Sequence, residues 1–219
     1  MRKLILFLTV LMGFSVCTVF AQDRVAASVE VSTLGPGAKL AVNLTDNFNL
    51  RFGGNGFTYH YTGKESNIDY KIDLKWMSFP VVVDWFPFKQ GLKLTGGIVV
   101  NENKVDLTAR PAVSYKVGDT VYTADQAGTL SGDIKFKTIA PYAGLGWGNA
   151  FGSSLHWSWG VDAGVMFHGK PKLNLTANGT LASNSTFAAD LEREKDNVRK
   201  KIDKYQYYPV LAVSVTYKF

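Results

Sequence analysis

Three polar side chains near residue 160 are of the types that form a hydrolytic triad. His156, Ser158 and Asp162 share one face if this segment is an extended strand. Such a triad needs a hydrogen bond from serine to histidine, so that the histidine can take the hydroxyl proton. Residues two apart on a strand are about 7 Å apart, which is too far for that bond. We therefore expect no catalytic residues here and no enzyme.

The residues that usually bind metals are few and scattered. The histidines are His60, His156 and His168, and the single cysteine is Cys17. Zinc needs about three or four converging ligands, and no pair of these residues has the spacing of a zinc motif. The glycine pairs form neither a P-loop nor a dinucleotide-binding motif. The sequence predicts no metal and no cofactor.

Six charged residues alternate with apolar ones in segments that could be strands. They are Glu30, Lys39, Arg51, Asp84, Lys93 and Asp162. If these segments form a narrow barrel, the six side chains face its interior, where buried charges are tolerated only when they are paired and hydrogen-bonded. The set contains as many acidic as basic residues. We expect an internal ion-pair network that closes the lumen and has a packing role, not a transport role.

The start of the chain has the pattern of a cleavable signal peptide. A basic end is followed by an apolar run to about Phe20, and small residues before the cut predict cleavage after Ala21. Residues 1–21 would then be the signal, and residues 22–219 one domain. A lipoprotein signal that uses Cys17 is the alternative, but the residues before that cysteine match such a signal poorly.

Composition excludes several classes of protein. The formal net charge is +6, and removal of the signal, which holds two basic and no acidic residues, would lower it to +4. The basic residues are scattered and do not form one stripe, so we expect no nucleic-acid partner. A chain cut after Ala21 has no cysteine and thus no disulfide. No later apolar run reaches the ~18 residues of a transmembrane helix. An exported chain of this kind can span a membrane only as a barrel.

Alternation of apolar residues with small or polar ones runs through most of the chain, as in strands with one face in lipid. The last segment is the clearest, with Val213, Val215, Tyr217 and Phe219 on one face. The alternating segments cover residues 27–32, 38–44, 48–53, 78–85, 92–101, 140–147, 155–167 and 207–219. They predict an all-β fold, an eight-stranded antiparallel transmembrane up-and-down barrel with both ends in the periplasm.

The connections between these segments differ in length. Residues 45–47, 87–91 and 149–154 have compact turn sequences, whereas 62–68, 110–132 and 168–206 are long and polar and are expected to face outward; the outer connection 34–37 is short. Residues 190–204, with mixed charges and an apolar stripe, predict one short surface helix. The phase of alternation shifts by one between Trp76 and Pro80, which predicts a β-bulge.

With these features the chain resembles the small bacterial outer-membrane barrels of the OmpA transmembrane-domain and OmpX type. The resemblance rests on the alternating strands, on Trp85, Trp147, Trp157 and Tyr217 at girdle positions, and on the ending Val213, Val215, Tyr217, Phe219. Phrases such as residues 45–48 and 141–148 are similar to those of surface-antigen barrels. The resemblance implies a bacterial outer membrane as the location, lipid and lipopolysaccharide as surroundings, and the ending as the signal for the barrel-assembly machinery.

Three functions remain open at this point. The first is a structural or surface-interaction role of a monomer through its outer loops. The second is a narrow porin or channel for small solutes, lined by the interior charges. The third is a lipid-modifying outer-membrane enzyme that uses rim residues such as His60 or His168. A soluble lipocalin-like barrel is the rival fold, but the polar face with Ser158 and Asp162 would line a hydrophobic cup poorly.

Overall fold

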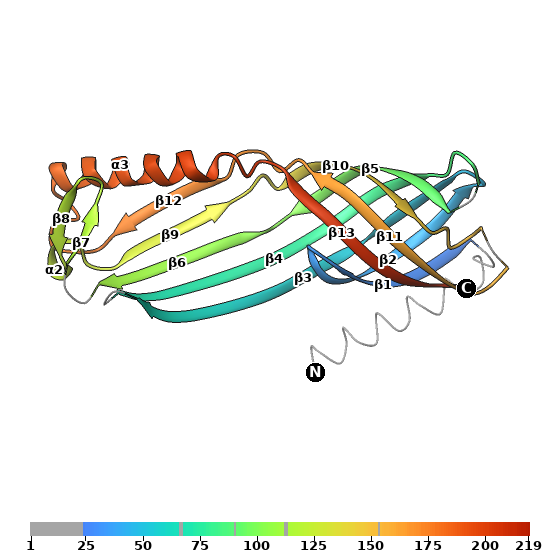
Figure 1. Cartoon of the computed structure of the whole chain (residues 1–219), viewed down its shortest axis with the longest axis horizontal. Helices are drawn as coiled ribbons and strands as arrows, with labels where there is room; N and C mark the ends of the chain where they lie inside the picture. Colours follow the sequence, from blue (N-terminus) through green and yellow to red (C-terminus); the bar gives the residue numbers. More distant parts are fainter. Residues whose placement is uncertain (1–23, 66–67, 90, 112–113, 153) are drawn as a thin grey trace, which may run out of the picture.

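A closed antiparallel β-barrel forms the body of the molecule (Figure 1). The computed structural model describes residues 24–65, 68–89, 91–111, 114–152 and 154–219, and the predicted signal peptide lies outside them. The barrel strands are β1 (Val25–Ser32), β2 (Gly35–Thr45), β3 (Phe48–Glu65), β4 (Ile68–Trp85), β5 (Leu92–Asn101), β10 (Ile139–Trp147), β11 (Trp157–Met166) and β13 (Tyr208–Lys218). Each pairs with the next, and β13 pairs with β1 to close the barrel. The predicted eight-stranded fold is confirmed.

The outer surface of the barrel is apolar because every second side chain of its strands points outward. Val29, Val31 and Leu211 are 65%, 71% and 59% exposed, although such residues are normally buried in a soluble protein. Trp85, Trp147 and Trp157 end or begin their strands at the rim that carries the short turns, and all three are exposed. This surface has the apolar band and aromatic girdle of a barrel surrounded by lipid.

Strands β3 and β4 continue well beyond the barrel and form a second sheet with three further strands. These are β6 (Lys104–Pro111), β9 (Leu130–Lys135) and β12 (Lys172–Ala177), in the order β3-β4-β6-β9-β12. We call it the outer sheet; Figure 1 shows it projecting from the end of the barrel opposite the C-terminus. The prediction of a long polar loop at 62–68 is therefore wrong, because β3 runs to Glu65 and β4 starts at Ile68.

The far end of the outer sheet carries a small cap, which we call the tip. It consists of β7 (Ser114–Val117), β8 (Thr120–Thr123), α2 (Ala124–Ala127) and the first turns of α3 (Ser185–Ile202). Helix α3 lies along β12 and also contacts β7 (Figure 1). The predicted surface helix is confirmed, with its start shifted toward Asn184, whose side chain caps the helix by accepting from the N–H groups of Thr186 and Phe187. Among the described residues, no helix is long and apolar enough to cross a bilayer.

The predicted bulge between Trp76 and Pro80 is wrong. Strand β4 keeps one register with β3 on both sides of this segment, from Phe52↔Val81 to Asn55↔Ser78, and its side chains keep alternating there between exposed and buried. What changes is the polarity of the two faces. Inside the barrel the outward face of β4 is apolar, whereas in the outer sheet the apolar residues lie on the face that continues the lumen. The pattern inverts near Ser78, where β4 passes from its pairing with β5 in the barrel to its pairing with β6 in the outer sheet.

Candidate functional site

The six charged residues expected to face the lumen all lie there. Their positions follow from alternation, because each sits between residues that point to the lipid side. Glu30, Arg51, Asp84, Lys93 and Asp162 are each no more than 9% exposed, and the side chain of Lys39 is 11% exposed. Such burial of charge is costly unless every charge has a partner.

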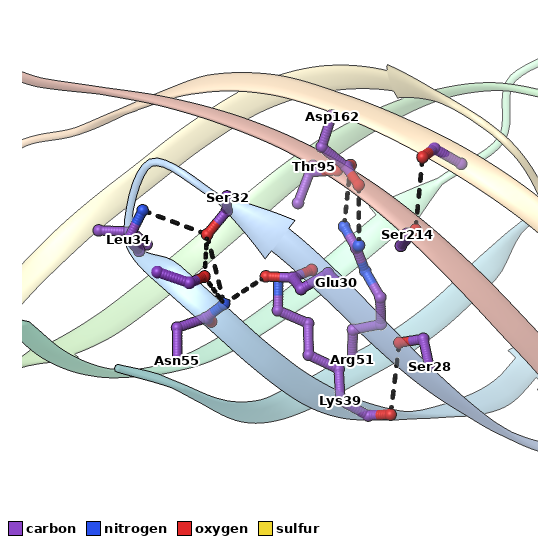
Figure 2. A network of polar contacts seen from close by, with 12 residues as sticks. Ser28, Glu30, Ser32, Leu34, Lys39, Arg51, Asn55, Thr95, Asp162 and Ser214 are labelled. Carbon is purple, nitrogen blue, oxygen red and sulfur yellow. Dashed lines mark hydrogen bonds and ion pairs between the residues drawn. The ribbon is translucent and has the colours of Figure 1, made fainter. Parts of the chain in front are cut away.

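Arg51 is the centre of the largest group, the Arg51 cluster, which consists of Arg51, Asp84, Lys93, Thr95 and Asp162. Its Nε lies 2.7 Å from Asp84 Oδ2, and its Nη2 donates to Asp84 Oδ1 at 2.9 Å. Nη1 and Nη2 each donate to an oxygen of Asp162 at 3.1 Å. One guanidinium thus joins β3 to β4 and, across the lumen, to β11; Figure 2 shows the two bonds from Arg51 to Asp162.

Two further groups complete the coordination of the carboxylates. Lys93 on β5 lies 3.0 Å from Asp162 Oδ1, and the Thr95 hydroxyl donates to Asp84 Oδ1 at 2.6 Å. Nearby, Lys39 pairs with Glu30 at 2.7 Å, and Asn55 donates to the same carboxylate at 2.6 Å. All six predicted residues are therefore in ion pairs, although the sequence did not indicate which residue pairs with which.

An apolar cluster lies in the lumen on the outer side of these charges. Its members, which we call the outer plug, are Leu34, Val99, Ala140, Met166 and Val210, with Tyr142 and Tyr208 packed against them. Toward the inner rim, Phe86 is only 1% exposed. The lumen contains two small cavities of about 30 and 20 Å³, both lined by Arg51. Each has room for a water molecule or two, and Arg51 stands between them.

The hydrolytic triad considered from the sequence does not form. His156 precedes β11, lies 3.0 Å through its Nδ1 from the carbonyl of Lys218, and stacks on Tyr217. Asp162 is held by Arg51 and Lys93. The Asp162 carboxylate is thus neutralised by two cations, and His156 lies at the barrel rim.

The other two histidines lie in separate places beyond the charged residues of the lumen, His60 on the part of β3 in the outer sheet and His168 just after β11. His60 is on the charged face of the outer sheet, where its hydrogen bond to Asp73 lowers the pKa of that carboxyl. His168 is 3% exposed between Phe136 and Tyr208, and burial lowers the pKa of its imidazole. No group of three or more potential metal ligands comes together within the part of the chain that the structure describes.

The outer sheet has one charged face and one apolar face. Asp73, Asp106 and Asp133 lie directly opposite one another on β4, β6 and β9. Like charges in this position repel, and each aspartate has a lysine of its own strand close by: Lys71 at 3.5 Å, Lys104 at 2.6 Å and Lys135 at 3.2 Å, respectively. The hydrogen bond to Asp106 raises the pKa of Lys104.

The apolar face is covered unevenly. Tyr59, Leu74, Val105, Ile134 and Leu173 form one row across the five strands. Leu173 is 7% exposed because α3 packs along β12, whereas Tyr59 at the other edge is 53% exposed. Sequence reasoning missed this sheet, although the alternation of Ile68, Tyr70, Ile72 and Leu74 with charged residues could have revealed it.

Within the tip, a buried residue pair joins the first turns of α3 to β8. Phe187, which is fully buried, packs edge-on against Tyr122 with ring centroids 4.9 Å apart. The Tyr122 hydroxyl donates to Asp190 at 2.6 Å, and Arg193 donates to the other carboxylate oxygen at 2.8 Å. The hydrogen bond from Tyr122, with others from Thr120 and Arg193, lowers the pKa of Asp190.

This carboxylate makes the tip sensitive to acid. Because the folded pKa of Asp190 lies below the ordinary 3.8, its contribution to stability is complete at neutral pH and is lost as the pH falls below that value. We expect the exchange of α3 amides, corrected for the intrinsic rate, to rise below about pH 4. In Asp190→Asn the α3 amides should exchange faster already at pH 7, and their exchange rate should rise less below about pH 4. An unchanged rise in this variant would refute the role of Asp190.

The four residues of the predicted assembly signal lie on β13 or directly after it. Val213 and Val215 are exposed on the lipid side, and Tyr217 packs against Phe219 and Trp157. The pairing of Val213 and Val215 with Val31 and Val29 places this strand at the closure of the barrel. Recognition of the ending by the assembly machinery stays a prediction.

Two solved structures have the same fold. CarO2 of Acinetobacter baumannii is 25% identical to this chain with a TM-score of 0.58, and CarO of the same organism is 23% identical with a TM-score of 0.55. In both cases the match covers 90% of this chain and 98% of the other. No family model and no curated protein sequence matches the chain. The neighbours and the apolar band together support an outer-membrane barrel protein, while a closer relation to OmpA or OmpX stays an expectation.

Proposed function

We propose that this protein is a surface-interaction protein of the bacterial outer membrane, in which a closed barrel anchors the outer sheet outside the cell. The observation that carries the proposal is the contrast between the barrel and the outer sheet. The lumen is crossed by the Arg51 cluster and filled by the outer plug, whereas β3 and β4 continue outward into an ordered sheet. A barrel built only to conduct would not need this sheet.

A channel is the second candidate, and one observation favours it. The two cavities that flank Arg51 are lined partly by polar groups, among them Asn49, Ser158 and Tyr142. A continuous path would require Arg51 to leave Asp162 and the outer plug to part. We propose no enzymatic step, because the histidine and the acid considered for one have other partners.

A trimmed barrel tests the proposed function. In this variant, short turns replace the outer parts of β3 and β4 and the segments 104–135 and 170–206, while the outer plug stays. Cells that display wild-type or trimmed protein at equal levels are compared for aggregation and attachment to protein-coated surfaces, and for uptake of small solutes. The proposal predicts that trimming lowers attachment and leaves uptake unchanged. Equal attachment with altered uptake would contradict it and favour the channel.

A further inference from the structure

The outer sheet has one open edge, formed by residues 56–65 of β3. On one side this segment pairs with β4 along its whole length. On the other side its neighbour is β2, whose ladder stops at Gly37↔Asn55 because the chain turns back into β1 at Leu34. Among the described strands, none continues the sheet beyond this point. At the start of this segment Gly35 still lies against Gly56 and Phe57. From Thr58 onward, alternate N–H and C=O groups point to a side that no described strand occupies.

This edge has few of the devices that usually prevent strand addition. Natural edge strands are blunted by proline, bulges, charged side chains, inward charges or a covering element. Of these, the segment carries a charged side chain near its end, Lys64, whose Nζ lies 4.0 Å from Asp69 Oδ1. The opposite edge of the outer sheet, β12, lies against α3. Strand β3 contains no proline, and the register shift recorded for its pairing with β2 lies at the far end, between Asn43 and Thr45. The edge is therefore available to another strand.

The side chains along the edge suit a strand as partner. Phe57, Tyr59 and Tyr61 are 41%, 53% and 48% exposed on the apolar face, and aromatic and β-branched residues favour cross-strand pairing. The opposite edge of this segment, which pairs with β4, shows which side chains pack beside these residues. There Trp76 stacks on Phe57 with centroids 5.7 Å apart, and Asp73 bonds to His60.

We propose that this edge binds an extended polypeptide segment of a partner protein, which adds to the outer sheet antiparallel to β3 and continues the line of β2. The backbone would supply the affinity. Specificity would come from apolar side chains opposite Phe57, Tyr59 and Tyr61 and a carboxylate opposite His60. The inference rests on the proposed function and names the surface that performs it.

A second copy of this chain is a poorer occupant. The barrel fixes the direction of β3, which runs from the turn end of the barrel toward the tip (Figure 1). Two copies in one membrane would present edges that run in the same direction, so they could not form an antiparallel pair. A separate polypeptide has no such restriction.

The probe is a synthetic peptide that copies residues 68–76, IDYKIDLKW, with blocked ends. It has the sequence of the β4 segment that already pairs with β3 along its other edge. Full-length protein in detergent micelles is mixed with this peptide or with a scrambled peptide whose alternation is broken. Hydrogen exchange is followed residue by residue. We expect every second amide of residues 58–65 to exchange rapidly in the free protein and at least tenfold more slowly with the peptide, and no change with the scrambled peptide.

Paired proline substitutions provide the matched control. In Thr58→Pro and Tyr59→Pro the lost N–H groups point to opposite sides of the strand, so one variant disturbs only the open edge and keeps the β3–β4 ladder. That variant should lose peptide protection at least tenfold while folding normally. Tyr205→Lys, which changes an exposed tyrosine after α3, should bind as wild type.

Three outcomes would overturn the inference. The alternate amides of β3 could already be protected without peptide, the peptide could slow amide exchange on β6 as much as on β3, or peptide binding could be unchanged in both proline variants. Concentration-dependent protection without peptide would also overturn it, in favour of self-association. If the trimmed barrel loses attachment but none of these peptide effects is found, the proposed function stands and the edge is not its binding surface.

Discussion

Replacement of Arg51 by alanine will lower the free energy of unfolding by about 3–5 kcal/mol, the usual cost of leaving buried charges without their partner. Arg51 is the shared cation of Asp84 and Asp162. Without it Asp84 keeps only the hydroxyl of Thr95, and Asp162 keeps only Lys93. Both carboxylates stay in the barrel interior, where water reaches them poorly, so their desolvation is no longer offset.

The measurement is urea unfolding of refolded protein in lipid vesicles, followed by tryptophan fluorescence and by migration on unheated gels. Lys116→Ala is the control, because it removes the cation of an exposed ion pair with Asp119, for which we expect less than about 1 kcal/mol. Arg51→Lys should recover part of the loss, since lysine keeps the charge but cannot bind both carboxylates through paired bonds. Equal stability of Arg51→Ala and Lys116→Ala would show that the network does not stabilise the barrel.

Replacement of Phe187 by alanine will release α3 from β7, β8 and α2 while the barrel stays folded. Phe187 is fully buried against Tyr122, Val117 and Ala127, and loss of a buried phenylalanine ring costs about 3–5 kcal/mol. This cluster contains no residue of the barrel strands. The lost stability should therefore appear as local opening of the tip and not as unfolding of the whole chain.

Limited trypsin digestion measures this local opening, because α3 carries several cleavage sites, among them Arg193 and Arg199. Since each 1.4 kcal/mol is a tenfold change in an equilibrium constant, cleavage within α3 should be at least about a hundredfold faster in Phe187→Ala. Phe88→Ala is the control, because Phe88 is 67% exposed in the turn between β4 and β5. Joint loss of the barrel and α3 would show that the tip does not open independently.

Much of the barrel could be predicted from the sequence, because lipid imposes a strict alternation on each strand. The burial of Arg51 and Asp162 followed from their inward positions in the alternation of residues along their strands. Their pairing with each other did not, because it depends on which strands face each other across the lumen, and alternation carries no such information. The pair Glu30 and Lys39 differs, because these residues lie on the neighbouring strands β1 and β2 and their contact depends on the register of that one ladder.

The outer sheet occupies segments for which the polar composition predicts loops, although its strands could be recognised from the sequence. Its strands alternate as regularly as those of the barrel, for example from Lys104 to Pro111. The change of phase near Pro80 predicts a bulge only if the same face is apolar along the whole strand. In the structure the strand keeps its register while the polarity of its two faces inverts, so a phase change can also accompany the passage of a strand from a barrel into a sheet outside it.

Single-channel recording of the refolded full domain in a planar bilayer shows whether the lumen is closed. The wild type is compared with a variant that combines Arg51→Ala and Met166→Ala, which removes the central cation and part of the outer plug. We predict no conductance steps for the folded wild type. Reproducible, charge-selective steps of the wild type that vary with the charge at residue 51 would contradict the closed lumen and make the protein a channel.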